Sequence, residues 1–202
     1  MPWMSLKKLP ERIAQELKSR VEAVVDYEWV RYWCQDESRF GLHTETGRVL
    51  TAPGVKPVGE VQWRFQAFWL YGAVEPMTGE SYFWEFSHLD SRCFEQYLEQ
   101  FAAAYPRELH VMQVDGAGAH RAGALKVPEI VILLFQPAYS PQVNPIERCW
   151  EWLKSGLKWL TCGDLEELRE QVRTRLQLAG RDLIASLTGW WWLIDQLSVS
   201  GL

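Results

Sequence analysis

The sequence has few cysteines, no long uninterrupted apolar stretch and no surplus of positive charge. Its four cysteines show none of the paired spacings that bind zinc or build a disulfide framework, which predicts a reduced, cytosolic protein. No segment is apolar enough to span a membrane, and the N-terminal residues lack the apolar run of a signal peptide. We therefore expect neither a disulfide-rich secreted domain nor a membrane protein. The cysteines are Cys34, Cys93, Cys149 and Cys162.

Positive charge is scarce, because 21 lysines and arginines stand against 26 aspartates and glutamates, for a formal net charge of -5. Affinity for a phosphate backbone comes largely from lysine and arginine. A nucleic-acid-binding protein of this composition must gather its basic residues locally or rely on a partner for part of the binding.

Apolar side chains are abundant, since 48% of the 202 residues are hydrophobic and 12 are tryptophan. A chain of this length and composition can bury a substantial core, which argues against disorder. We expect a single domain over residues 1–202, with its core at about 27–160. Most tryptophans should lie in the core or an interface, and a surface that stacks nucleic-acid bases is the alternative.

The order of the expected elements predicts an α/β fold in which a mixed sheet is flanked by helices. Apolar periodicity and turn residues mark each element, and Asn144 is expected to cap the most strongly patterned helix. Such an order is compatible with a ribonuclease-H-like arrangement. Helices are expected at 10–25, 90–104 and 145–160 and within 164–188, and strands at 27–35, 61–74, 81–86, 109–114 and 130–135.

Three acidic residues stand at the ends of recognisable blocks. Asp36 closes an aromatic strand-like run, Asp115 closes another, and Glu147 lies near the start of the helix that follows Asn144. Each has an ordinary explanation, since Asp36 and Asp115 suit turns and Glu147 has capping-box spacing from Asn144. Together they favour a site for magnesium, which prefers oxygen ligands and can activate one oxygen of a phosphodiester while stabilising another.

The blocks around these acids resemble the signature motifs of mariner-like DDE transposases of bacterial insertion sequences. The matching segments are QDESRFGL at 35–42, VDGAGAH at 114–120 and QPAYSPQVNPIERCWEWLK at 136–154. The resemblance covers about residues 30–160. It implies a ribonuclease-H-like catalytic domain in which Asp36, Asp115 and Glu147 bind Mg²⁺ or Mn²⁺, as two ions, and catalyse DNA cleavage and strand transfer at transposon ends.

The chain departs from the family pattern in three respects. Only 31 residues separate Asp115 from Glu147, and Gly116 stands where the family often has asparagine. No helix-turn-helix segment is recognisable before the first expected strand. We therefore expect a catalytic half that binds DNA together with an upstream helix-turn-helix segment or subunit, could form a homodimer, and works in the bacterial cytoplasm on nucleoid DNA.

Several further residues are candidates for contacts with DNA or for support of the metal ligands. Any one basic residue among them is more often ordinary solvated surface. Glu37 is the alternative to Asp36 as the first ligand, and only the motif favours Asp36. The candidates are His120, Arg48, Lys56, Asn144 and Arg148, with Arg121, Lys126 and Lys154 as further basic residues near a DNA path.

Two other functions remain open at this stage. The chain could be a decayed transposase remnant retained as a DNA-binding or protein-binding module. It could also be a metal-dependent nuclease that does not transpose. Intact acids at all three motif positions argue against decay, whereas the acidic net charge argues for dependence on a partner.

Overall fold

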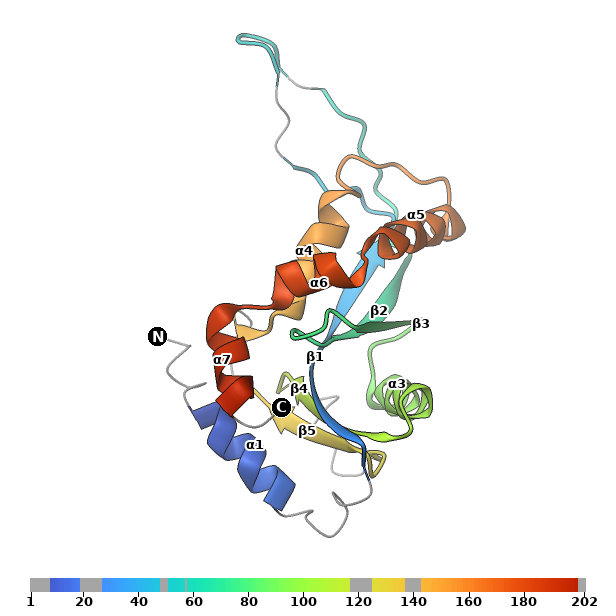
Figure 1. The fold of residues 1–202 in the computed structure, drawn as a ribbon. Coiled ribbons are helices and arrows are strands. Elements are labelled where there is room, and N and C mark those ends of the chain that lie inside the picture. Colours follow the sequence, from blue (N-terminus) through green and yellow to red (C-terminus); the bar gives the residue numbers. More distant parts are fainter. Residues whose placement is uncertain are drawn as a thin grey trace.

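A computed structural model describes residues 8–18, 27–47, 51–56, 58–116, 125–136 and 143–199. In these residues a five-stranded sheet has the order β3-β2-β1-β4-β5 (Figure 1). The β1·β4 and β4·β5 pairs are parallel, and the β1·β2 and β2·β3 pairs are antiparallel. The strands are β1 (Trp29–Gly41), β2 (Ala67–Val74), β3 (Ser81–Phe86), β4 (Glu108–Val114) and β5 (Val131–Phe135).

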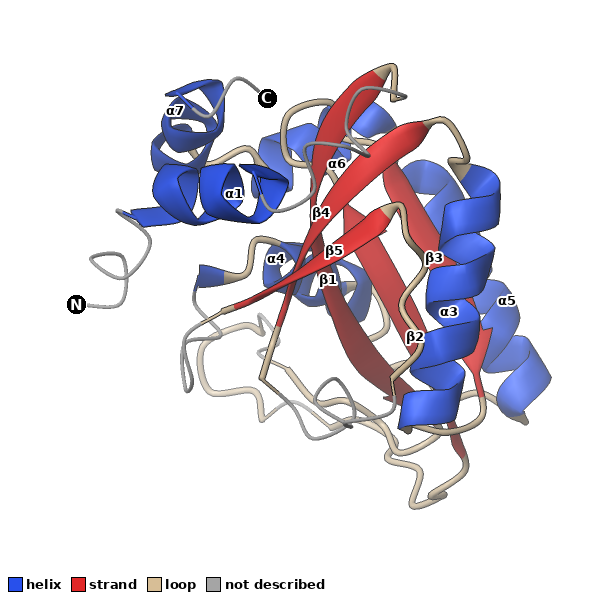
Figure 2. Ribbon diagram, turned by 90° about the horizontal axis from the view of Figure 1, so that it is seen from below, coloured by secondary structure: helices blue, strands red, loops and turns tan. Residues whose placement is uncertain are grey.

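Helices cover both faces of the sheet, which confirms the predicted mixed sheet flanked by helices (Figure 2). Helix α3 packs on one face, α4 and α5 pack on the other, and α1 contacts α7. Within the described ranges, no helix is long and apolar enough to cross a membrane. The helices are α1 (Leu9–Lys18), α3 (Ser91–Ala104), α4 (Ile146–Ser155), α5 (Leu165–Leu178), α6 (Arg181–Thr188) and α7 (Trp191–Val199).

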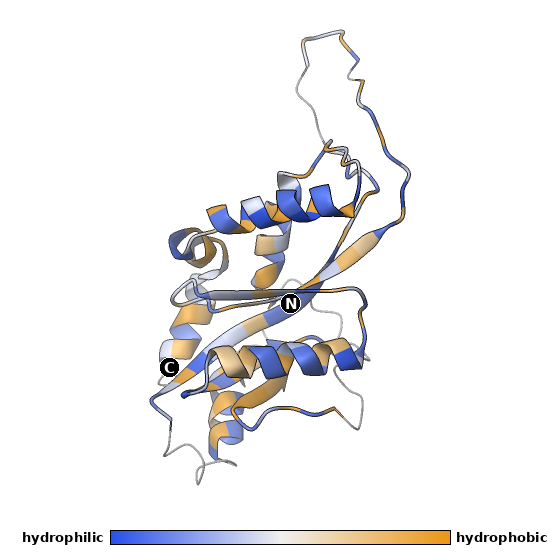
Figure 3. Cartoon of the chain, turned by 90° about the vertical axis from the view of Figure 1, so that its right-hand side faces the viewer, coloured by the Kyte–Doolittle hydropathy of each residue, from blue (hydrophilic) through white to orange (hydrophobic). Residues whose placement is uncertain are grey.

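The core has two parts because side chains along a strand alternate between the faces of the sheet. Tyr32 and Cys34 of β1 join the apolar cluster on the α4 face, whereas Trp33 joins the cluster on the α3 face. The helices are correspondingly amphipathic, with hydrophilic and hydrophobic residues in turn along their length (Figure 3). Both faces of the central strand β1 are therefore buried over this stretch.

Strand β1 is longer than the predicted strand at 27–35. Its second half continues to Gly41 because it pairs with β2, from Asp36 opposite Gly72 to Gly41 opposite Ala67. The interpretation of Asp36 as a turn residue is therefore wrong, since Asp36 lies within a strand. Between the two strands, the described residues 42–47, 51–56 and 58–66 belong to a protruding excursion (Figure 1), whose base is closed by hydrogen bonds such as Leu42 N to Gln66 O.

Within the described residues, the predicted helices appear in the expected order up to α6, but several boundaries differ. Helix α1 is described as far as Lys18, and the remaining predicted residues 19–25 lie outside the described residues. Helix α4 ends at Ser155 rather than at 160, and helix α7 was not predicted. Strands β2 and β3 pair as an antiparallel hairpin, and Asp164 caps α5 by accepting a hydrogen bond from the Glu167 backbone N–H.

The predicted cap of α4 is wrong. Pro145 occupies the N-cap position and makes no side-chain cap hydrogen bond. The Asn144 side chain is turned toward the sheet instead, where its Nδ2 donates a 2.9 Å hydrogen bond to the Gln35 carbonyl oxygen. A buried backbone carbonyl that needs a donor competes for the same amide that could have capped the helix.

Candidate active site

Asp36 of the central strand β1 lies near the point where the neighbouring strand β4 ends and Asp115 follows. The last printed pair between the parallel strands β1 and β4 joins Cys34 to Gln113. Continuing this register by two residues sets Asp36 beside Asp115, which directly follows the end of β4. Because paired residues face the same side of a sheet, both carboxylates belong to the face that α4 covers.

Glu147 lies in the first turn of α4, the helix that packs on this face of the sheet. The segment that enters the helix is tied to the sheet at two points, by the Asn144 hydrogen bond to Gln35 and by a 3.3 Å bond from Gln113 Nε2 to the Val143 carbonyl. Gln35 immediately precedes Asp36, and Gln113 lies two residues before Asp115. The strands that carry the two aspartates therefore also position the helix that carries the glutamate.

Gln35 and Gln113 were not identified from the sequence. Both side chains are almost completely buried, and Gln113 also bonds to Gln136 and Tyr32. Their place in otherwise apolar strand runs could have identified them from the sequence, because a buried amide is expected only where it has hydrogen-bond partners.

The environment of Asp36 disfavours its charged form. Burial, followed by the negative charges of Glu37 and Glu147, raises the Asp36 pKa to about 8, against the opposing effect of hydrogen bonds from the Glu37 backbone and from Trp150. The Trp150 indole Nε1 donates to Asp36 Oδ2 over 2.9 Å. A carboxylate in this setting is stabilised by a nearby cation.

Glu147 is influenced by the same accumulation of charge. Burial raises its pKa, Lys154 lowers it, and the charges of Glu151 and Asp115 raise it further. Asp36 is thus coupled to Glu147, and Glu147 to Asp115. The three carboxylates form one electrostatically connected group on the α4 side of the sheet.

Asp36 and Glu147 line a cleft of about 400 Å³. The donors have the chemistry that Mg²⁺ and Mn²⁺ prefer, namely carboxylate oxygens. Within the part of the chain that the structure describes, no three Asp, Glu, His or Cys side chains are gathered closely enough to hold one metal ion. The fit of this donor set to a divalent metal rests on its chemistry and charge, not on carboxylates already gathered around one point. The cleft is lined by Asp36, Glu37, Ser38, Arg39, Glu147, Trp150, Glu151 and Lys154.

Glu37 is placed differently from Asp36, although it also lines this cleft. It accepts a 2.8 Å hydrogen bond from Gln35 Nε2. Burial and the Glu37 charge raise the pKa of Tyr97, which belongs to the core on the α3 face. Glu37 is thus coupled to the face of the sheet that α4 does not cover.

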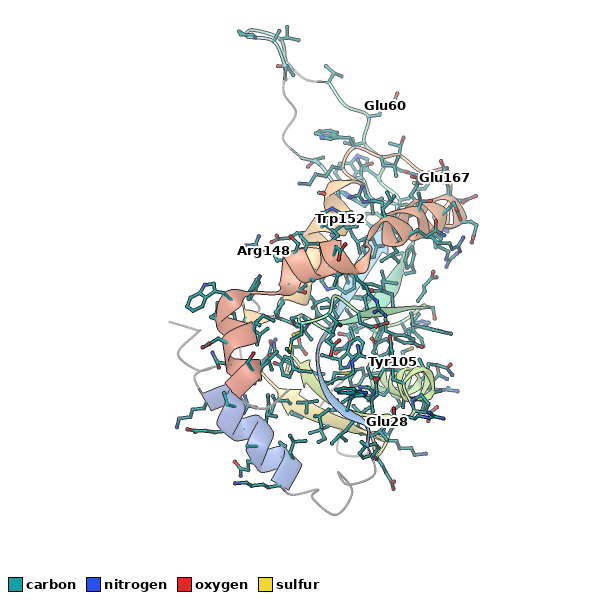
Figure 4. The ribbon with its side chains drawn as sticks, viewed as in Figure 1. Glu28, Glu60, Tyr105, Arg148, Trp152 and Glu167 are labelled. Carbon is teal, nitrogen blue, oxygen red and sulfur yellow. The ribbon has the colours of Figure 1, made fainter. Side chains whose placement is uncertain are left out.

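The remaining candidates that the structure describes lie on different elements. Arg148 is exposed on α4, where Figure 4 labels it, and forms a 2.9 Å ion pair with Glu151. Lys56 and Lys126 are exposed, with Lys56 in the excursion between β1 and β2. The other candidates, Arg48, His120 and Arg121, lie outside the described residues.

Comparison with known proteins identifies relatives of the chain. A family model described as DDE superfamily endonuclease matches residues 31–169. An uncharacterized protein of Sinorhizobium fredii, y4pE/y4sA, is 30% identical over 94 residues, which are 46% of this chain and 68% of that protein.

Solved structures of the Mos1 transposase have a similar fold. Its paired-end complex with the left transposon end has a TM-score of 0.65 at 13% identity, and its mariner paired-end complex with Mn has a TM-score of 0.63 at 12% identity. Each match covers 98% of this chain and 62% of the transposase chain. The likeness confirms the ribonuclease-H-like fold, and this chain spans less than two thirds of the length of those transposases.

Proposed function

Because this chain belongs to the DDE superfamily endonucleases, we propose that residues 1–202 form the catalytic domain of a transposase, which cleaves and joins DNA strands at transposon ends. The observation that carries the proposal is the parallel β1·β4 register, whose continuation by two residues beyond Cys34 and Gln113 brings Asp36 beside Asp115. Glu147 lies in the first turn of α4 and is coupled electrostatically to both aspartates. Carboxylates fixed in this way by a sheet and a packed helix suit metal-dependent phosphodiester chemistry.

We propose that Asp36, Asp115 and Glu147 bind Mg²⁺ or Mn²⁺, as two ions. Two bound ions would activate the attacking oxygen and stabilise the leaving oxygen, first for water at the transposon end and then for the freed 3′ hydroxyl at the target. The charge gathered on the three carboxylates supports this role, because a divalent cation removes their mutual repulsion. Mos1 complexes solved with Mn and with Mg offer a further parallel.

We propose that DNA enters along the cleft and that Lys154, which lines it, contacts a phosphate. Lys56 and Arg148 are exposed and are available for further phosphate contacts. The net charge of -5 limits the affinity that the domain can supply alone. We therefore propose that a helix-turn-helix segment or subunit provides recognition of the transposon ends.

The test is a nicking assay on supercoiled plasmid, with Mg²⁺, with Mn²⁺ and with EDTA. Metal-dependent nicking separates an endonuclease from an inactive remnant or a binding module. Joining of a duplex with a free 3′ hydroxyl to the plasmid then separates a transposase from a nuclease that does not transpose. Absence of nicking by the folded wild-type chain at every metal concentration would contradict the proposal.

A further inference from the structure

The setting of Asp36 in the sheet suggests how its carboxylate is held, an inference that rests on the proposed function. Asp36, Gly72 and Phe83 occupy one row across β1, β2 and β3, because Asp36 pairs with Gly72 and Gly72 pairs with Phe83. Residues paired across strands present their side chains to the same face. The row therefore has a carboxylate at one end, an aromatic ring at the other and no side chain between them.

Trp150 of α4 lies over this gap. It is only 3% exposed, and its ring packs against Phe83 with the centroids 5.7 Å apart and the planes at 64°. Its indole Nε1 reaches Asp36 Oδ2 over 2.9 Å. Because Trp150 follows Glu147 by three residues, the two side chains lie on the same side of the helix. One helix thus supplies both a proposed metal ligand and a hydrogen-bond donor to another.

Gly72 allows the indole to come this close. A Cβ at position 72 would lie 2.7 Å from Trp150 Cη2 and 2.7 Å from Phe83 Cε1. Separations this short are far inside van der Waals contact, so a larger residue would force one of the rings to move. The glycine on β2, the tryptophan on α4 and the aspartate on β1 are therefore mutually dependent in position.

We propose that Trp150 is a positioning residue of the metal site, whose indole N–H holds one oxygen of Asp36 and leaves the other for the metal. The hydrogen bond fixes the rotamer of Asp36 before metal arrives, so less side-chain freedom is lost on binding. Gly72 supports the same arrangement by leaving open the space that the indole occupies.

The test is a thermal-melting titration of the protein with Mn²⁺ in the absence of DNA. Trp150→Phe keeps an aromatic ring but removes the N–H donor. We expect the Mn²⁺ concentration at half-maximal stabilisation to rise about 10- to 100-fold, the effect typical of losing a group that orients a metal ligand. The Mn²⁺ requirement of plasmid nicking should rise in parallel, with much of the rate restored at saturating metal.

Trp152→Phe is the matched control, because the Trp152 ring lies on the same helix but faces the Arg175 guanidinium, 4.5 Å from its centroid. The control should keep the wild-type Mn²⁺ midpoint. A purely structural role for Trp150 would lower the melting temperature in EDTA without moving that midpoint.

Gly72→Ala is a second variant, in which a methyl group added on β2 pushes the indole away from its position. This variant should also raise the Mn²⁺ midpoint. A wild-type midpoint in folded Trp150→Phe would overturn the inference. If that variant does not fold, a wild-type midpoint in Gly72→Ala overturns it equally. A wild-type protein that neither responds to Mn²⁺ nor nicks DNA would instead contradict the proposed function.

Discussion

The side-chain amide of Asn144 donates a hydrogen bond to the backbone carbonyl of Gln35, with a nitrogen-to-oxygen distance of 2.9 Å. This single contact joins the segment that begins α4 to the strand residue immediately before Asp36. It spans 109 positions in the sequence, and both residues are buried. The spacing between Glu147 and Asp36 therefore depends on a hydrogen bond as well as on packing.

Removing this bond should weaken both the fold and the site. Asn144→Ala leaves the Gln35 carbonyl buried without its donor, which costs about 1–3 kcal/mol in the free energy of unfolding. Urea unfolding measures that loss, and plasmid nicking at a temperature where the variant is folded should fall because Glu147 is no longer anchored. Wild-type stability in Asn144→Ala would show that the contact does not anchor α4.

Neutralising Asp36 should stabilise the metal-free protein while removing its activity. The folded-state pKa of Asp36 is about 8, above its ordinary value of 3.8, so the folded state favours the protonated carboxyl. The stabilising contribution of this protonated form is fully present below pH 3.8 and is lost as the pH rises to about 8. In EDTA at pH 8, Asp36→Asn should raise the melting temperature by about 2–4 °C, the shift expected for roughly 1 kcal/mol in a domain of this size.

The gain from Asp36→Asn should disappear near pH 4, where the wild-type carboxyl is already protonated. Thermal melts at the two pH values give the comparison. An equal effect at pH 4 and pH 8 would mean that the charge of Asp36 is not the cause.

His110 should make the fold sensitive to mild acid. Its Nδ1 accepts from the Trp33 indole over 3.1 Å, its Nε2 donates to the Tyr105 carbonyl over 3.0 Å, and burial lowers its pKa below 6.5. Above about pH 6.5 the lowered pKa of His110 does not affect the free energy of unfolding. Below that pH the unfolded state binds a proton more readily than the folded state, so stability falls as the pH drops toward the folded-state pKa.

His110→Gln is the matched variant for this effect, because an amide can accept and donate at the same positions without titrating. Its melting temperature should be lower than that of the wild type at pH 7.5 but should decline less between pH 7 and pH 5. Parallel curves for the two proteins would exclude His110 as the sensitive group.

DNA binding by this chain alone should be weak, show little sequence preference and decrease steeply with salt. With a net charge of -5, binding must come from a few local phosphate contacts, and each releases counterions. A salt-series titration of an end-containing and a scrambled duplex measures both properties, and fusion of a helix-turn-helix segment should restore preference for the end. Tight, end-selective binding without that segment would refute the expectation.

The order of elements and the positions of the acids could be predicted because both depend on local signals. Apolar periodicity marks α3 and α4, turn residues mark the β2–β3 hairpin, and a motif marks Glu147. The length of β1 could not be predicted, because residues 36–41 are strand only by virtue of pairing with β2. Local polarity in that segment resembles a turn.

The supporting contacts were inaccessible from sequence for a related reason. Asn144 has the side chain of a good helix cap, and only the tertiary structure shows that a buried carbonyl takes its amide. Gly72 and Trp150 are 78 positions apart, and their mutual dependence follows from the register of β2 and the packing of α4. Both arrangements depend on contacts between segments that are far apart in the sequence.

We propose that Asp36, Asp115 and Glu147 act together as a metal-dependent DNA-cleaving site. The most direct measurement is plasmid nicking in Mg²⁺ or Mn²⁺ by the wild type, by Asp36→Asn, Asp115→Asn and Glu147→Gln, and by Glu170→Gln, which changes an exposed acid paired with Arg173 on α5. The wild type and Glu170→Gln should nick only with metal, and each of the three site variants should lose at least about 100-fold in rate while remaining folded. Undiminished nicking by any folded site variant would contradict the claim for that residue, and metal-independent nicking by the wild type would contradict it as a whole.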